Sequence, residues 1–194
     1  GNLKRLTAVA SHFPDLHVNV EAVSDRSGQE LSFFASAEST GISSLSAFTE
    51  GHKPVCKVRT ISLRDYMARR RIGHVDFLKV DAEGHDKFIL DGFPWEIDRP
   101  ELIIAEFEDK KTEQTGYTTH ELCALLLDLG YSVFVSEWLP IEKYGLAHDW
   151  HRFVKYSPGL VLHEAWGNLV AFRDQPDEGE VRRIVMRCIK FSKR

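Results

Sequence analysis

Cysteine is scarce in this sequence. The 194 residues contain three cysteines, Cys56, Cys123 and Cys188, and no two of them form a CxxC pair. An odd number of widely spaced cysteines argues against the disulfide framework that small secreted domains use. The pattern is typical of reduced thiols, so we expect a cytoplasmic protein.

Long apolar runs and an excess of positive charge are also missing. No apolar stretch approaches the roughly 20 residues that a membrane-spanning helix requires. The amino terminus, with Lys4, Arg5 and His12, lacks the apolar core of a signal peptide. The formal net charge of -4 argues against nucleic acid as the main partner, because phosphate binding requires a concentrated basic surface. We expect no transmembrane segment and no nucleic-acid partner, and the sequence does not define an oligomeric state.

Apolar strand patterns alternate with amphipathic helix patterns along most of the chain. Strands are predicted at 16–23, 30–35, 55–61, 75–80, 101–107, 131–136 and 168–172. Helices are predicted at 3–10, 62–72, 82–93 and 118–129, and Ser62 with Asp65 predicts a variant capping box. Strand–helix–strand alternation with apolar strands predicts an α/β fold with a mainly parallel sheet.

The chain is long enough for one domain, which we place at 1–173, followed by a tail at 174–194. The residue pattern of the tail predicts a basic amphipathic helix with Val181, Ile184 and Val185 on one face. Such a helix packs on its own domain or lies on an anionic membrane.

Acidic side chains follow two of the predicted strands. Asp81, Glu83 and Asp86 come after strand 75–80, and Glu106 ends strand 101–107. Ligands in α/β sheets bind beyond the carboxyl ends of the strands. These residues therefore indicate a functional site, and capping of the next helix is the alternative.

Several segments together resemble the FkbM methyltransferases. The strings SLRD, VDFLKVDAEGHD and ILDGF resemble the family's TLDD helix, its VDFLKIDVEGHE strand–turn–helix and its VLRGA helix end; they stand at 62–65, 75–86 and 89–93. Upstream, AVSDRSG and TGISSLS resemble the family's AVSDRSG turn and GxSSL loop. The likeness covers about residues 1–107.

This resemblance implies a Rossmann-like class I methyltransferase sheet, mainly parallel, with an antiparallel last strand. It implies an O-methyltransferase that uses S-adenosyl-L-methionine and acts on a hydroxyl of a sugar, glycan or other natural-product-like small molecule. The class binds this cofactor with a glycine-rich turn after its first strand and an acidic residue ending its second. Neither feature is found here, and Gly1 aligns just after that acidic residue.

We therefore expect the chain as given to lack the first two strands of the sheet and to bind the cofactor poorly by itself. Strands 16–23 and 75–80 would then each lose a neighbour and expose an edge. The alternative to an enzyme is a non-catalytic, truncated methyltransferase-fold module that binds a protein partner.

The resemblance also assigns roles to residues. Ala22, Val23 and Ser24 match positions that flank the adenine, and Asp81 matches the carboxylate nearest the transferred methyl. His85 is the first candidate for the base that deprotonates the acceptor hydroxyl. Glu83 and Glu106 are second choices for the base or for hydroxyl binding. Asp81, Glu83 and Glu106 could instead hold a divalent cation, although we predict no metal.

A second polar group surrounds His148, Asp149, Trp150 and His151, with His163 further on. It lacks cysteine and a closed set of four zinc ligands. We interpret it as a substrate-side loop or plain surface rather than a zinc site. Nearby aromatic side chains could stack on a sugar ring or pack as a lid or core; they are Trp138, Tyr144 and Trp166.

Overall fold

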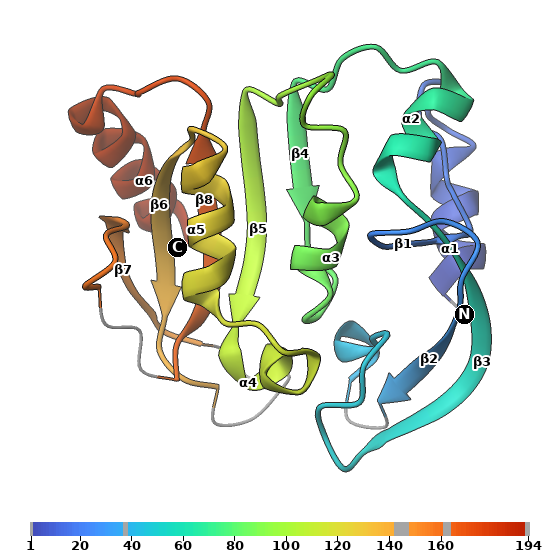
Figure 1. The fold of residues 1–194 in the computed structure, drawn as a ribbon. Helices are drawn as coiled ribbons and strands as arrows, with labels where there is room; N and C mark the ends of the chain where they lie inside the picture. Colours follow the sequence, from blue (N-terminus) through green and yellow to red (C-terminus); the bar gives the residue numbers. More distant parts are fainter. Residues whose placement is uncertain (1, 37–38, 142–147, 161–163, 193–194) are drawn as a thin grey trace.

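The protein folds into two β-sheets with helices around them (Figure 1). This computed structural model describes residues 2–36, 39–141, 148–160 and 164–192. One sheet has the order β1-β3-β2 and the other has the order β4-β5-β8-β6-β7. The strands are β1 (Ala22–Val23), β2 (Glu30–Ser36), β3 (His52–Ile61), β4 (Phe77–Val80), β5 (Leu102–Glu108), β6 (Ser132–Trp138), β7 (Trp150–Lys155) and β8 (Trp166–Phe172).

Helices connect most of these strands. The α-helices are α1 (Asn2–Ala10), α2 (Leu63–Arg70), α3 (Asp86–Asp91), α4 (Asp109–Thr112), α5 (Thr119–Asp128) and α6 (Glu178–Ser192). Two short 3-10 helices are η1 (Thr40–Ile42) and η2 (Glu113–Thr115). The α/β class is confirmed, and the four strands predicted at 75–80, 101–107, 131–136 and 168–172 share the five-stranded sheet.

The prediction of a mainly parallel sheet is wrong for the described residues. The β1–β3 and β4–β5 pairs are parallel. The β2–β3, β5–β8, β6–β8 and β6–β7 pairs are antiparallel. The cause is the last strand, which the resemblance implied would be antiparallel. Because β8 enters between β5 and β6, these two strands run in the same direction without pairing with each other.

The two faces of the five-stranded sheet are covered differently. On one face, Leu122 and Leu126 of α5 pack against Ala105, Val135 and Leu169 to form a fully buried core. Strand alternation turns the intervening residues to the other face. The helix α6, predicted as the basic amphipathic tail, lies behind the sheet in Figure 1 and crosses that second face.

The strand predicted at 16–23 is reduced to β1. Only Ala22 and Val23 pair with β3, and Leu16 and Val20 are exposed. A strand persists only where a neighbour satisfies its backbone groups, and no neighbour reaches the earlier residues in the described chain. The strands β1 and β4 also do not pair with each other there, so the chain forms two sheets rather than one.

One of the two hydrogen bonds of the predicted capping box is formed at the start of α2. The Ser62 side chain accepts a hydrogen bond from the Asp65 backbone nitrogen at 3.1 Å. The Asp65 carboxylate does not return to the Ser62 nitrogen but accepts from the Ser27 hydroxyl. Ser27 in turn accepts from the Ser62 nitrogen at 2.9 Å. A neighbouring loop therefore completes the cap.

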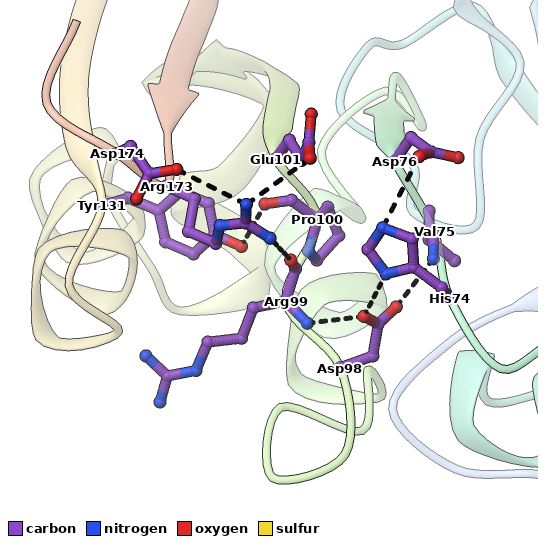
Figure 2. Close-up of polar contacts among 10 residues, drawn as sticks. All are labelled: His74, Val75, Asp76, Asp98, Arg99, Pro100, Glu101, Tyr131, Arg173 and Asp174. Atoms are coloured by element: carbon purple, nitrogen blue, oxygen red, sulfur yellow. Dashed lines mark hydrogen bonds and ion pairs between the residues drawn. The ribbon is translucent and has the colours of Figure 1, made fainter.

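The amino-terminal ends of β4 and β5 are held together by Asp98 (Figure 2). Its buried carboxylate accepts backbone hydrogen bonds from Val75 at 2.8 Å and from Arg99 at 2.9 Å. The same carboxylate bonds to His74 Nδ1 at 2.8 Å. This network fixes the end of the sheet that lies opposite the acidic residues.

The strand β7 was not predicted, because its Trp150–Lys155 segment follows a stretch without clear periodicity. It pairs along the edge of the sheet with β6. Across the described residues, none of the helices combines the length and the apolar composition that crossing a membrane requires.

Candidate active site

A tight turn joins β4 to α3 and carries most of the acidic residues that the sequence indicated. The helix predicted at 82–93 is shorter than expected, because residues 81–85 do not take helical geometry. Glu83 and Gly84 both adopt left-handed backbone conformations, with φ of 52° and 87°. A Cβ atom on Gly84 would lie 3.0 Å from both the Cβ and the carbonyl oxygen of Lys111. Gly84 thus lets the turn press against α4.

Lys111 is the centre of a buried ionic cluster. Its side chain is 3% exposed, and its ammonium lies 2.6 Å from Glu83 Oε2, 3.1 Å from Glu106 Oε2 and 3.0 Å from Glu108 Oε2. The three glutamates come from the β4–α3 turn and from the end of β5. The lysine comes from α4, the short helix that follows β5. One cation therefore holds the carboxyl ends of two adjacent strands together.

Burial sets the protonation of this cluster. Desolvation raises the pKa of Glu106 to about 8, because the Lys111 charge offsets only part of the cost of burying a carboxylate. Desolvation also raises the pKa of Glu83. Burial alone would lower the pKa of Lys111, but the charges of Glu106, Glu108 and Glu83 outweigh it and raise that pKa. Near neutral pH Lys111 stays charged, and the raised pKa keeps Glu106 mostly protonated.

Asp81 lies at the open side of the same cluster. It is exposed, and its carboxylate pairs with the ammonium of Lys79 on β4. Oxygen atoms of Asp81, Glu83 and Glu106 all lie within 4.8 Å of one another. These oxygens suit a hard divalent cation, but Lys111 already supplies positive charge to two of the three carboxylates.

Asp86 adds a further buried carboxylate at the start of α3. Asp86 is 1% exposed, and burial raises the pKa of its carboxyl to about 6. Within the described chain, no donor reaches Asp86 Oδ1. A buried acceptor without a donor is costly, so this atom is suited to a donor from a bound molecule.

His85 points to the other sheet rather than to Lys111 and its glutamates. It is buried, it stacks on Phe88, and its Nε2 lies 2.9 Å from the Ser24 hydroxyl. Ser24 Oγ donates its single proton to Asp25 Oδ1 at 3.0 Å, so it accepts from Nε2–H of His85. Burial lowers the pKa of His85, and the charge of Asp25 opposes this shift. His85 is therefore neutral at physiological pH.

The other segments of the resemblance also meet at this turn. Ser24 directly follows β1, and of the three residues expected near the adenine it is the one that bonds to the β4–α3 turn, at His85. Ser44, in the loop that resembles GxSSL, is buried, and its hydroxyl donates to the Glu83 carbonyl oxygen at 2.8 Å. The structure thus brings four separate sequence segments to the carboxyl ends of β4 and β5.

A family comparison agrees with this convergence. A family model described as the methyltransferase FkbM domain matches residues 3–133, which is more than half of the 194-residue chain. The chain belongs to the FkbM methyltransferase domain family. The match includes every segment of the ionic cluster and ends inside β6. Comparisons with curated proteins and with solved structures each return no match.

Sequence reasoning missed Lys111 of the ionic cluster, and it saw Glu108 only as part of the acidic end of strand 101–107, with no role of its own. Both are buried, and they belong to the run Glu106-Phe107-Glu108-Asp109-Lys110-Lys111 that ends β5 and begins α4. The signal for them was a lysine close to the acidic end of an apolar strand, where buried carboxylates require a nearby cation.

The histidine-rich segment supplies no side chain to the ionic cluster of this FkbM domain among the described residues. His148 packs against Trp166 with ring centroids 5.3 Å apart, and Trp150 and His151 belong to β7. His163 and Tyr144 lie outside the described residues. In the part of the chain that the structure describes, the one carboxylate, histidine or cysteine group with metal-ligand spacing is Asp81, Glu83 and Glu106.

Proposed function

We propose that this FkbM domain is an S-adenosyl-L-methionine-dependent O-methyltransferase. The acceptor we propose is a hydroxyl of a sugar or natural-product-like small molecule. The observation that supports it is the excess of carboxylates beyond β4 and β5. Asp81 and Asp86 add to the three glutamates around Lys111. Such a site favours a ligand that carries positive charge.

The residues present suit this cofactor, which bears a sulfonium and an ammonium group. Asp81 is the exposed carboxylate of the site and would hold the positively charged end of the cofactor. The buried Asp86 Oδ1, which has no donor in the described chain, could accept a hydrogen bond from the same ligand. Ala22, Val23 and Ser24 would flank the adenine. When bound, the cofactor supplies the methyl group for an in-line displacement, which requires alignment with the acceptor oxygen.

The acceptor hydroxyl also needs a base. Glu106 is favoured by geometry, because it stands in the carboxylate cluster and burial raises its pKa to about 8. A base is most effective when its pKa lies near the working pH. Glu83 is the second carboxylate candidate. His85, the first choice from the sequence, stays a prediction, although its Nε2 already bonds to Ser24.

The pH profile of turnover distinguishes these bases. The measurement is the rate of methyl transfer by the protein expressed at the full length that its gene encodes, with cofactor affinity followed by calorimetry. If Glu106 is the base, the rate rises with an apparent pKa of about 8, and Glu106→Gln removes that rise and costs roughly 10²–10⁴-fold. If His85 is the base, the rise lies below pH 6.5, because its pKa is lowered, and His85→Ala removes it.

Asp81→Asn tests the site itself. We expect it to weaken cofactor binding and to reduce turnover at every pH, with a loss of several kcal/mol of transition-state stabilisation, on the order of 10²–10³-fold. Asp76→Asn is the matched control, since this carboxylate is at the opposite end of β4 and contacts only His74 among the described side chains. Parental turnover in Asp81→Asn would overturn the site, and absence of cofactor binding by the wild type would favour the protein-binding module.

A further inference from the structure

A cavity of about 710 Å³ lies between the five-stranded sheet and α6. Its floor is the sheet face opposite α5, and Ile184, Val185 and Cys188 of α6 form its roof. The volume is in the range of pockets that hold small molecules. The ionic cluster described above is not part of this wall, apart from the Lys79 side chain that pairs with Asp81.

Strand register arranges the floor of the cavity in rows. Residues paired across neighbouring strands project from the same face of a sheet. The first row across the sheet is Lys79, Ile104 and Val170, and all three residues line the cavity. The next row is Glu106, Asn168, Ser136 and Phe153. This second row is polar over three adjacent strands, which is unusual for a face covered by the apolar side of an amphipathic helix.

The third row is aromatic. Glu108, Trp166, Trp138 and Trp150 stand opposite one another in the register of the sheet. Trp138 and Trp166 stack with ring centroids 5.5 Å apart. Trp150 donates from Nε1 to the Ser136 hydroxyl at 3.3 Å. Flat indole faces thus stand next to hydrogen-bonding groups, two residues or about 7 Å along each strand.

The polar row has capacity to bind a ligand. Asn168 lines the cavity, and its side-chain amide makes no hydrogen bond to any described part of the chain. An amide of this kind offers two donors and one acceptor oxygen. An apolar occupant would leave these groups buried without partners, at a cost, whereas hydroxyls would satisfy them.

The floor of the cavity adjoins the ionic cluster through the register of the sheet. Glu106 stands two residues beyond Ile104 on β5, on the same face, and directly opposite Asn168. Lys79 lines the cavity and also pairs with Asp81. A ligand bound along the polar row would therefore present one end to Glu106 and Asp81.

We propose that this cavity binds a glycoside with an apolar aglycone, with the sugar ring on the tryptophan and polar rows and the aglycone under α6. Tryptophan faces pack against the apolar face of a sugar ring, Asn168 and Ser136 bind its hydroxyls, and Ile184 and Val185 contact the aglycone. This inference deepens the proposed function and rests on it only in naming the ligand as the acceptor, because binding itself needs no cofactor.

The test is calorimetric titration of the 194-residue chain without cofactor. The probes are octyl glycosides of glucose, galactose and mannose below their micellar concentrations, with the corresponding methyl glycosides and 1-octanol for comparison. We expect an octyl glycoside to bind more tightly than either its methyl glycoside or octanol. Asn168→Leu should weaken this binding about tenfold, and Ser136→Ala and Trp138→Ala should weaken it as well.

Matched controls separate the cavity from the rest of the surface. Asn19→Leu changes an asparagine that bonds to Arg69 of α2. Trp95→Phe removes an indole beside Asp98, in a different pocket. Neither variant should change the affinity. Circular dichroism of Asn168→Leu and Ser136→Ala would establish that both fold, so that a loss of binding reports on the cavity.

Three results would each overturn the inference. The first is that no octyl glycoside binds more tightly than octanol, and the second is that Asn168→Leu and Ser136→Ala leave its affinity unchanged. The third is a concentration-dependent dimer in sedimentation that Trp138→Ala dissociates, which would make the cavity an interface between copies. If Asn168→Leu methylates an acceptor at the wild-type rate, the methyltransferase proposal stands, and only the proposal that the acceptor binds in this cavity is rejected.

Discussion

His85 Nε2 and Ser24 Oγ lie 2.9 Å apart, and they join the two sheets of this domain. The residues are 61 positions apart in the chain. Gly92 allows the approach, because a Cβ atom there would lie 2.4 Å from the Ser24 carbonyl oxygen. The β1 end and the β4–α3 turn are therefore fixed relative to each other by side-chain and backbone packing rather than by strand pairing.

The buried His85 predicts a loss of stability in acid. Its native pKa is lowered from about 6.5, so the unfolded chain binds more protons and the free energy of unfolding falls as the pH drops below 6.5 toward the native pKa. We expect His85→Gln to remove this part of the pH dependence and to cost about 1–3 kcal/mol at neutral pH. Urea unfolding between pH 5 and 8 measures both. Exposed His17→Gln is the control, and an unchanged slope in His85→Gln would contradict the prediction.

His74 predicts a pH dependence of the opposite sign (Figure 2). Its hydrogen bond to Asp98 raises its pKa above 6.5, so the stabilising contact is fully present below 6.5 and is lost as the pH rises through the native pKa. In His74→Gln, the free energy of unfolding should no longer fall as the pH rises from 6.5 through the native pKa of His74. An NMR titration of the His74 ring with a midpoint below pH 6.5 would show that Asp98 does not raise the pKa of His74.

Gly84 should tolerate no side chain. Gly84→Ala adds a Cβ atom in a left-handed conformation and 3.0 Å from Lys111 atoms, while Gly28→Ala adds one at φ of 81° with no atom within 4 Å. The control therefore carries only the conformational cost of about 1–2 kcal/mol. We expect Gly84→Ala to be measurably more destabilising in thermal unfolding. Equal losses for the two variants would mean that the turn does not press on α4.

Lys111 is expected to be the most sensitive lysine in the chain. Lys111→Met leaves Glu83, Glu106 and Glu108 without their common cation, and breaking a buried ion pair in this way typically costs about 3–5 kcal/mol. The neighbouring Lys110→Met changes an exposed side chain and should alter the free energy of unfolding little. Chemical denaturation of both variants checks this, and a loss below about 1 kcal/mol in Lys111→Met would refute it.

Local pattern was a good guide wherever a segment forms its structure from its own periodicity. The apolar segment at 101–107 became β5, and the segment at 118–129 became α5, which begins at a capping box of Thr118 and Glu121. The turn residues 82–85 were mistaken for helix, because the left-handed conformations of Glu83 and Gly84 depend on contact with α4 rather than on sequence spacing.

The sequence by itself determined most of the strands and helices and that acidic residues follow β4 and end β5, since periodicity and the position of a residue along a strand are local properties. Only the tertiary structure decided that β8 enters between β5 and β6, that Lys111 pairs with Glu83 of the β4–α3 turn, and that His85 binds Ser24. Each of these depends on contacts between distant residues. Burial then shifts charge states, as it does for Glu106, and burial is a property of the packed chain alone.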